Sequence, residues 1–217
     1  MKFIVKHQDS YSRGELLLRF LFGPFYIILP HAIVQMVLMI GLMFIKIATF
    51  WIILFTGKFP RGMFDYNVKM MRYSLRVTAR NMNLADGYPA FGLNGTDTST
   101  DFDVAYQEEV SRGSMLLRAL FGGIMVLPHM IVLVFRMIGV LFINFLAFWI
   151  ILFTGAYPKG MFDFVIGTLR WNFRVSCYLS YLTHDYPPFT SAALPGEDAG
   201  GGRAVANDEL IDSLSAI

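Results

Sequence analysis

Two nearly identical stretches dominate this sequence. FWIILFTGKFPRGMFDY occupies residues 50–66, and FWIILFTGAYPKGMFDF occupies residues 148–164. The correspondence reaches much further, because VKHQDSYSRGELLLRFLFG from Val5 matches VAYQEEVSRGSMLLRALFG from Val104. The second copy is one residue shorter ahead of its Leu-Pro-His segment. We therefore predict a duplicated unit, with copies at 3–91 and 102–189, a Gly/Thr/Asp-rich linker at 92–101 and a disordered tail at 190–217.

Long apolar runs within each copy set the class of the protein. Hydrophobic residues make up 55% of the 217 residues. The run between Arg19 and Lys58 contains one fully charged side chain, and so does the equivalent run of the second copy. Runs of this length are typical of membrane proteins, so we expect an integral membrane protein. The single cysteine, Cys177, allows no intrachain disulfide, and a net charge of +2 gives no reason to expect nucleic acid binding.

Each apolar run allows two paths through a membrane. It either crosses once as a long kinked helix, or it forms a helical hairpin that turns at Leu-Pro-His. Pro30 and Pro128 lack an N–H and disfavour helix in the preceding residue, so they fit both paths. Basic residues flank both ends of each run, and a hairpin keeps every flank on the cytoplasmic side, as the positive-inside rule prefers. We expect an all-α fold of two transmembrane helical hairpins with both termini in the cytoplasm.

The segment after each Thr-Gly pair has the pattern of a basic amphipathic helix. Gly57 and Gly155 are suited to end the preceding helices in a left-handed turn. Basic residues then recur every three or four positions, which predicts a helix at the membrane–water interface. Extended Tyr-Pro-x-Phe segments close each unit. Anionic headgroups are the expected ligands of four of these basic residues, although a solvated positive-inside face would explain them too: Arg72, Arg76, Arg170 and Arg174.

Polar residues inside the apolar runs form the second group of candidates. Lys46, its counterpart Asn144, and Arg136 are intramembrane polar groups, suited to docking a partner subunit or to snorkelling. His31 and His129 occupy equivalent positions and would ligate a haem or a metal if they met across a pseudo-twofold axis. Capping of the turn is the simpler interpretation, because no further ligands accompany them. We therefore expect neither a metal nor another cofactor.

Four fragments of the second copy resemble a known family. They are LPH (127–129), ILFTGAYPKGMFDF (151–164), LRWNFRV (169–175) and DYPPF (185–189). Together they resemble the bacterial membrane family catalogued as domain of unknown function 4389 (DUF4389). The resemblance implies tandem copies of this domain in a multi-pass protein of the bacterial inner membrane, and the family offers no established activity to transfer. The first copy departs from the pattern with MRYSLRV (71–77) and GYPAF (87–91).

No P-loop, GxSxG, HExxH or CxxC motif occurs, so we expect a protein that is not an enzyme. The first hypothesis is an accessory or scaffold subunit that docks to a larger membrane complex or to further copies of itself. The second is a protein that binds anionic lipid through its paired basic helices and organises the bilayer. A small channel or transporter in the seam between the copies is a third hypothesis, weakened because neither apolar run contains an acidic residue.

Overall fold

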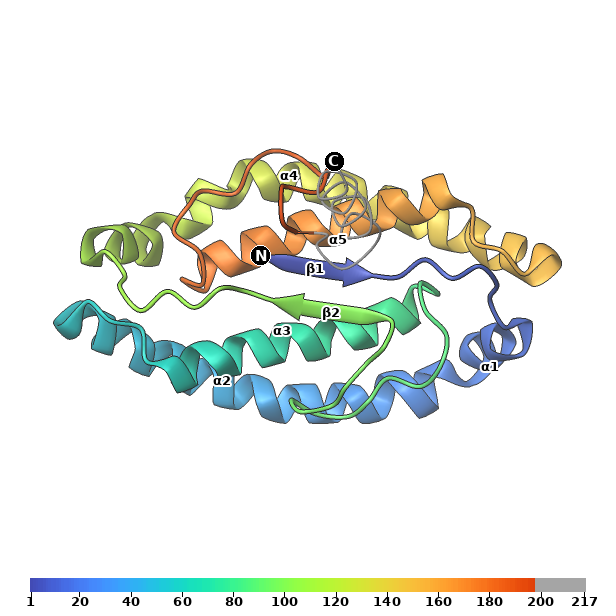
Figure 1. Ribbon diagram of the computed structural model, residues 1–217, viewed down its shortest axis with the longest axis horizontal. Coiled ribbons are helices and arrows are strands. Elements are labelled where there is room, and N and C mark those ends of the chain that lie inside the picture. The colour runs from blue at the N-terminus through green and yellow to red at the C-terminus, as the bar shows by residue number, and fades with distance from the viewer. Residues whose placement is uncertain (198–217) are drawn as a thin grey trace, which may run out of the picture.

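The structure is a computed structural model that describes residues 1–197 of the chain. Two long apolar helices, each followed by a shorter helix, surround a two-stranded ribbon (Figure 1). The elements in chain order are β1 (Lys2–Val5), α1 (Arg13–Gly23), the π-helical segment η1 (Pro24–Ile28), α2 (Leu29–Thr56), α3 (Arg61–Asn81), β2 (Thr100–Asp103), α4 (Arg112–Thr154) and α5 (Lys159–Leu179).

The predicted hairpins are wrong, because neither apolar run turns back at its proline. The first run is one helix of 44 residues, made of α1, η1 and α2, and the second is the 43-residue helix α4. The buried side of α4 explains this continuity: Val126, His129 and Leu133 keep a helical spacing across Pro128. A proline removes one hydrogen bond and kinks a helix, whereas a turn would also break this packed stripe. At about 1.5 Å per residue each helix is about 65 Å long, twice the thickness of a bilayer core.

The π-helical segment accounts for the one-residue difference between the copies. Its residues, Pro24–Ile28, lie where the first copy is one residue longer. An extra residue inserted into an α-helix is accommodated as a single π turn. Arg19 before the segment and His31 after it are both buried, as are their counterparts Arg118 and His129. The π turn thus absorbs the insertion and keeps both buried side chains on the inner side of the helix.

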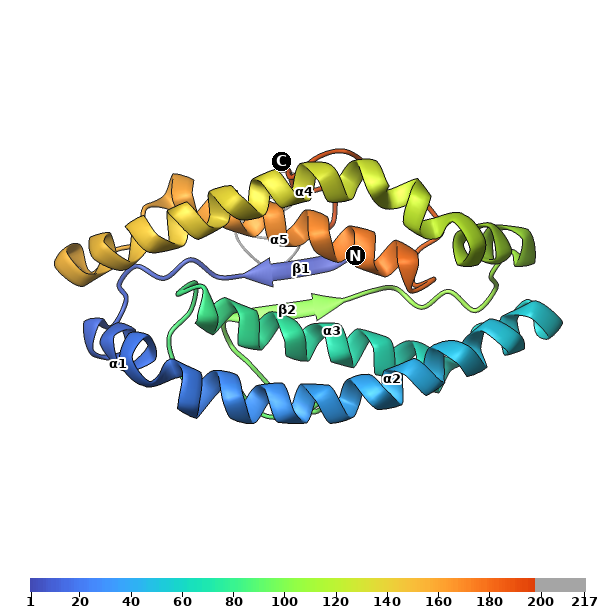
Figure 2. The same ribbon diagram turned by 180° about the vertical axis from the view of Figure 1, so that it is seen from behind.

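The shorter helices run antiparallel along the long ones. The Tyr66 hydroxyl of α3 donates to the Leu38 carbonyl of α2 over 2.7 Å, and Arg136 of α4 donates to Thr168 Oγ1 of α5 over 3.0 Å. The predicted helix ends are confirmed, because Gly57 and Gly155 adopt φ values of 75° and 76°. The ribbon and the connecting segments lie toward the viewer in Figure 1, and the two long helices lie toward the viewer in Figure 2.

An internal pseudo-twofold relates the two copies. Phe3 pairs with Phe102 in the antiparallel ribbon, and these two residues hold equivalent positions in the two copies. Each copy also makes the same contact with the other. Arg13 donates to the carbonyl of Phe153 over 3.1 Å. Arg112 donates to the carbonyl of Phe55 over 3.1 Å. Each copy therefore caps the long helix of the other, as in a closed symmetric dimer.

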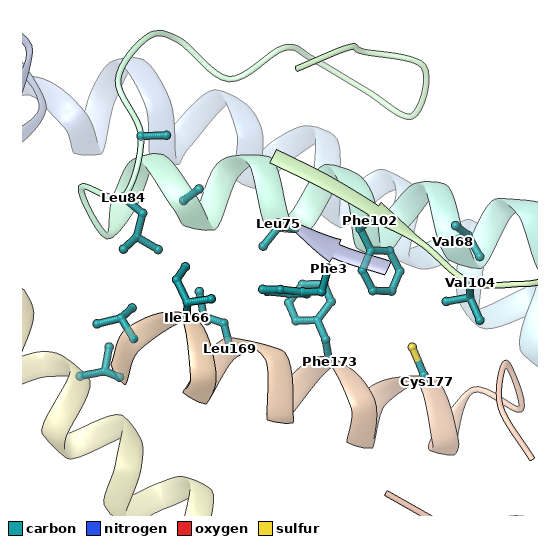
Figure 3. Packing of buried hydrophobic residues seen from close by; sticks show 14 of the residues in the cluster. Phe3, Val68, Leu75, Leu84, Phe102, Val104, Ile166, Leu169, Phe173 and Cys177 are labelled. Atoms are coloured by element: carbon teal, nitrogen blue, oxygen red, sulfur yellow. The ribbon is translucent and has the colours of Figure 1, made fainter. Parts of the chain in front are cut away.

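The hydrophobic core lies between α3 and α5, beneath the ribbon. Phe3, Phe102 and Phe173 meet edge to face, with ring centroids 5.2 to 6.5 Å apart (Figure 3). Phe3 and Phe102 have no exposed surface. Burying such a side chain stabilises a fold by about 1.5–3 kcal/mol, so the ribbon joins the two copies into one core.

Two boundaries of the predicted organisation need correction. The expected linker at 92–101 enters strand β2 at Thr100, and its carbonyls at Gly92 and Gly95 accept hydrogen bonds from Arg76. The first part of the expected tail is also held: Arg174 donates to the carbonyl of Thr190 over 2.8 Å. Buried guanidinium groups need acceptors, and these segments supply them. The rest of the tail, including a short helix expected from Asn207, lies outside the described residues.

Candidate membrane-contacting surface and polar sites

The exposed apolar surface belongs almost entirely to the two long helices. Within the described chain, every exposed large hydrophobic side chain lies on them, except Tyr88, Phe91, Tyr186 and Phe189. Those four belong to the Tyr-Pro-x-Phe segments. On the first helix the exposed series runs from Leu17 to Phe55, so it covers nearly the whole length. Continuous apolar surface of this extent marks contact with a membrane or with another protein.

Both long helices are long and apolar enough to cross a membrane. Their inner sides, however, are covered along most of their length by helices that carry charge. Contacts between α2 and α3 extend from Thr49 Oγ1 with Met63 Sδ, at 3.2 Å, to His31 Nδ1 with the Tyr73 hydroxyl, at 2.7 Å. Helix α3 also carries five Lys and Arg residues. An upright α2 would draw this basic helix into the hydrocarbon, where charged side chains are costly even when paired.

The four arginines predicted to bind headgroups make contacts within the chain. Arg76 is fully buried and donates to the carbonyl of Gly92 over 2.5 Å. Arg174 is 5% exposed, and its Nε donates to the Glu197 carboxylate over 2.8 Å. Thr190 and Gly92, their carbonyl acceptors, are equivalent in the two copies. Both side chains therefore clamp the segment that follows the Tyr-Pro-x-Phe motif.

Arg72 and Arg170 lie nearer the surface. Arg72 donates to the carbonyl of Phe102 over 2.8 Å and to the Asp103 carboxylate over 3.3 Å. Arg170 donates to the carbonyl of Ser191 over 3.4 Å and lies 4.0 Å from Glu197. The geometry thus gives these side chains a structural role in holding the ribbon and the segment around Ser191. Headgroup binding by them stays a prediction.

A neighbouring ion pair holds the linker to the end of α3. Arg80 and Asp97 are both about 5% exposed and form a two-pronged pair, with one contact at 2.9 Å. Burial alone would raise the pKa of Asp97. Hydrogen bonds from Arg80, from the Thr100 hydroxyl and from the Ser99 amide outweigh this effect and lower the pKa to about 2. Asp97 therefore stays ionised at neutral pH.

The two histidines lie in equivalent aromatic clusters. The His31 ring stacks on Phe91 at 4.1 Å between centroids, and Nδ1 is 2.7 Å from the Tyr73 hydroxyl. The His129 ring stacks on Phe189 at 3.8 Å, and its Nδ1 accepts from Trp171 Nε1 over 2.9 Å. Each ring thus makes these contacts inside its own copy. The described residues contain no group of three or more potential His, Cys, Asp or Glu metal ligands.

These clusters explain the closing motif of each unit. The Tyr-Pro-x-Phe segment packs back onto its own unit, because Tyr88 and Phe91 both contact His31. The Tyr88 hydroxyl also donates to the carbonyl of Tyr26 over 2.8 Å. The histidine is therefore the point at which the end of each unit is fastened to the middle of its long helix, not a residue at a turn.

The three polar residues predicted to lie within the membrane differ in their hydrogen-bond partners. Arg136 donates to Thr168 and lies over the Phe164 ring at 4.4 Å. Asn144 accepts a hydrogen bond from Asn83 over 3.3 Å. Lys46 is exposed, and its ammonium group has no hydrogen-bond or ion-pair partner among residues 1–197. Of the three predicted docking residues, Lys46 alone makes no hydrogen bond or ion pair within the described structure.

Sequence reasoning missed a polar group at the end of α3. Arg19 is 9% exposed, donates to Asn83 Oδ1 over 3.3 Å and pairs with Asp86 over 2.9 Å. Asn83 in turn contacts Asn144 on α4. The sequence carried two signals for this cluster: the extra residue after Gly23, and asparagines where the second copy has other residues.

Comparison with known proteins supports the resemblance for one copy. Residues 113–191 match the family model described as "Domain of unknown function (DUF4389)". The match begins in the first turn of α4 and includes α5 and the YPPF segment. It does not extend to the first copy, so tandem family domains remain a prediction, as does a bacterial origin. No curated protein and no solved structure matches the chain.

Proposed function

We propose that this protein is a non-catalytic membrane protein that lies within one leaflet and organises the surrounding lipid. In this arrangement both long helices lie along the membrane plane. Their exposed sides face the acyl chains, whereas α3, α5 and the ribbon lie toward the headgroups and water. The proposal adopts the bilayer-organising hypothesis, but with the apolar helices instead of the four arginines as the lipid-binding element.

One observation carries this proposal. The first long helix is apolar and exposed from Leu17 to Phe55, and its opposite side is lined by the basic helix α3. A helix with one apolar side and one side against polar structure suits an interface, in contrast to an upright span. Both long helices also lie toward the same face (Figure 2). Wedging this volume into one leaflet would expand that leaflet and favour curvature.

The test is the sidedness of the two ends of each long helix. In a Cys177→Ala background, single cysteines replace Asp9 and Arg61, which precede and follow the first long helix and are exposed. A membrane-impermeant maleimide is applied to right-side-out and to inside-out membrane vesicles. We expect both positions to react from the same side. The equivalent positions of the second copy, Glu108 and Lys159, should react from that side too.

Depth measurements complete the test. A fluorophore attached at Met36, midway along the exposed side, is quenched by nitroxide lipids that carry the label at different depths. In-plane insertion places it within one leaflet, roughly 5–10 Å below the headgroups. Labelling of Asp9 and Arg61 from opposite sides, with Met36 at the bilayer centre, would refute the proposal and establish a transmembrane span.

Lys46 favours a second candidate function. It is an exposed charge within an otherwise apolar surface, and intramembrane charges of this kind commonly pair with another chain. Docking to a larger membrane complex is therefore compatible with in-plane insertion. Replacing Lys46 by Leu should then release a co-purifying polypeptide while leaving membrane insertion unchanged.

A further inference from the structure

A cavity of about 420 Å³ lies between α1, the end of α3 and the second half of α4. It is bounded by both copies, with Phe20 and Ile28 on one side and Leu141, Phe145 and Trp149 on the other. These five side chains are also among the exposed large hydrophobic residues of the long helices. The cavity therefore opens on the apolar surface, where a membrane lipid could enter laterally. Its volume falls in the range of small-molecule sites.

The cavity is formed where the two copies differ. Its lining includes Pro24, Ile27 and Ile28 of the π-helical segment, which has no counterpart in the second copy. The lining residues Asn81 and Asn83 correspond to Leu179 and Tyr181. Single π turns inside α-helices occur frequently at functional sites.

In the second copy Leu179 occupies part of the equivalent place. A Cβ placed on Gly122 would lie 3.2 Å from Leu179 Cδ2, so this leucine already packs against the long helix. Arg118 lies over the Tyr178 ring at 4.4 Å, where the first copy has Arg80. In place of Leu179 and Tyr181 the first copy has the smaller, polar Asn81 and Asn83, and its long helix has one extra residue.

The charges at the polar end of the cavity are already neutralised. Arg19 pairs with Asp86 over 2.9 Å, and Arg80 pairs with Asp97. A phosphate would have to compete with these carboxylates for the same guanidinium groups. The cavity therefore favours an uncharged ligand.

Two of the residues that line the cavity have hydrogen-bond donors without an acceptor. Arg80 is 4% exposed, and its Nε–H has no acceptor among the described residues. Arg19 can only donate, so Asn83 accepts with Oδ1 and donates its amide to Asn144 Oδ1. The amide N–H groups of Asn144 are then left without an intramolecular acceptor in the described structure. A ligand that presents carbonyl oxygens would match these donors.

We propose that this cavity binds a membrane lipid with an uncharged, carbonyl-bearing head and a hydrocarbon chain. The carbonyls meet Asn144 and Arg80, and the chain leaves between Phe20 and Phe145 into the bilayer. Two sources supply this chemistry: the ester groups of a diacylglycerol, and the ring carbonyls of an isoprenoid quinone. The inference rests on the proposed function only in that the apolar surface faces lipid.

The repeat provides a matched pair of reporters. Trp149 lines the cavity, and its counterpart Trp51 lies on the first long helix with similar exposure, 45% against 52%. Two variants are compared in nanodiscs, each with one of these tryptophans replaced by Phe. Both also carry Trp171→Tyr, because Tyr73 holds the equivalent place in the first copy. The probes are decylubiquinone, a diacylglycerol brominated on its acyl chains, and a brominated phosphatidylglycerol as the charged control.

We expect saturable quenching of Trp149 by one of the two neutral probes, and only the linear quenching of a bulk lipid contact at Trp51. The neutral probe that saturates identifies the source of the carbonyl. Asn81→Leu, which installs the second copy's residue, and Asn144→Leu should each weaken binding at least fivefold. Equal, non-saturating quenching of both tryptophans, or saturation by phosphatidylglycerol alone, would overturn the proposal.

Deletion of Pro24 tests the role of the π turn. It gives the first copy the length of the second, so Arg19 and His31 should keep their buried positions while the cavity closes. Deletion of Met36 serves as the control, because it rotates one half of the helix by about 100° against the other. We expect the first deletion to fold and lose probe binding, and the second to unfold. Retained binding after Pro24 deletion would refute this role. The result is independent of the sidedness test, so the two proposals can fail separately.

Discussion

The buried pair of Arg80 and Asp97 gives the sharpest test of how the two copies are connected. Replacing Asp97 by Asn keeps the shape of the side chain and removes its charge. The two side chains are 5% and 6% exposed, so the guanidinium would be left buried without a counter-ion. Breaking such a pair costs about 3–5 kcal/mol, and we expect the lower end because the Asn carbonyl still accepts one hydrogen bond.

The control is Asp103→Asn. This carboxylate is 58% exposed and pairs with Arg72, which is itself 32% exposed. Exposed pairs contribute about 0–1 kcal/mol, so the control should change the free energy of unfolding by less than 1 kcal/mol. For a chain of this size 1 kcal/mol corresponds to roughly 2–4 °C, which predicts a Tm lowered by about 6–12 °C for Asp97→Asn and by no more than about 4 °C for the control.

Cys177 provides the assay. It is the single cysteine of the chain and is fully buried, so a maleimide that fluoresces on reaction reports unfolding during heating in mild detergent. Equal shifts of the two variants would refute the assignment of Asp97 as a buried structural counter-ion.

The pH dependence of stability provides an independent check on Asp97. Its folded pKa of about 2 lies below the value of about 3.9 for an unfolded chain. The stabilisation is therefore complete above pH 4 and is lost as the pH falls toward 2, by up to about 2 kcal/mol. Tryptophan fluorescence should show this loss in the unmodified protein. A variant carrying Asp97→Asn should lack that contribution, and an identical acid profile would contradict the predicted ionisation.

Three further measurements test separate features. Gly57→Ala should lower the free energy of unfolding by about 1–2 kcal/mol, because Gly57 adopts a left-handed φ of 75°. Gly62→Ala is the control: a Cβ there meets open space, so this change should be neutral or stabilising. Equal Tm shifts of the two variants would contradict this prediction. Burial raises the pKa of the Cys177 thiol to about 12. Iodoacetamide at pH 8 should therefore modify this thiol only after denaturation. Rapid labelling of the native protein would show that the core opens. Native mass spectrometry from nanodiscs should detect the protein with retained lipid, and a second polypeptide in fixed ratio would favour the docking function instead.

Local signals in the sequence were sufficient for the helices and their ends. Thr-Gly predicted the left-handed caps at Gly57 and Gly155, and the spacing of basic residues predicted α3 and α5. The hairpins were wrong because the basic flanks were interpreted as evidence for a turn, whereas Pro128 fitted either path. The spacing of Val126, His129 and Leu133 across it indicates one continuous helix.

Long-range pairings were not predictable in the same way. Arg76 and Arg174 recur at helical spacing, but periodicity does not reveal that backbone carbonyls of Gly92 and Thr190 will accept their hydrogen bonds. The ribbon was missed because each strand has four residues and the partners lie far apart in the chain. Only the equivalence of Phe3 and Phe102 hinted at it, since a twofold axis must pair equivalent residues.

Some differences between the two copies create no binding site. Comparing one of them with the differences at the cavity supports a function for the cavity. Arg136 replaces Leu38, and Phe164 replaces Tyr66. In the first copy the tyrosine hydroxyl donates to the Leu38 carbonyl, and in the second the guanidinium donates to Thr168 and covers the Phe164 ring. That exchange leaves both polar groups with partners, because the Tyr66 hydroxyl and the Arg136 guanidinium each donate a hydrogen bond within the protein.

The exchanges around the π-helical segment are different in kind. They replace Leu179 and Tyr181 by smaller, polar asparagines, leave the Nε–H of Arg80 and the amide of Asn144 without acceptors, and open space at the apolar surface. A buried donor without an acceptor, such as the Nε–H of Arg80, lowers the stability of a fold. A ligand that supplies the missing acceptors removes that cost. The symmetric residues therefore build the frame, and the cavity beside the asymmetric π-helical segment is the place to search for the lipid.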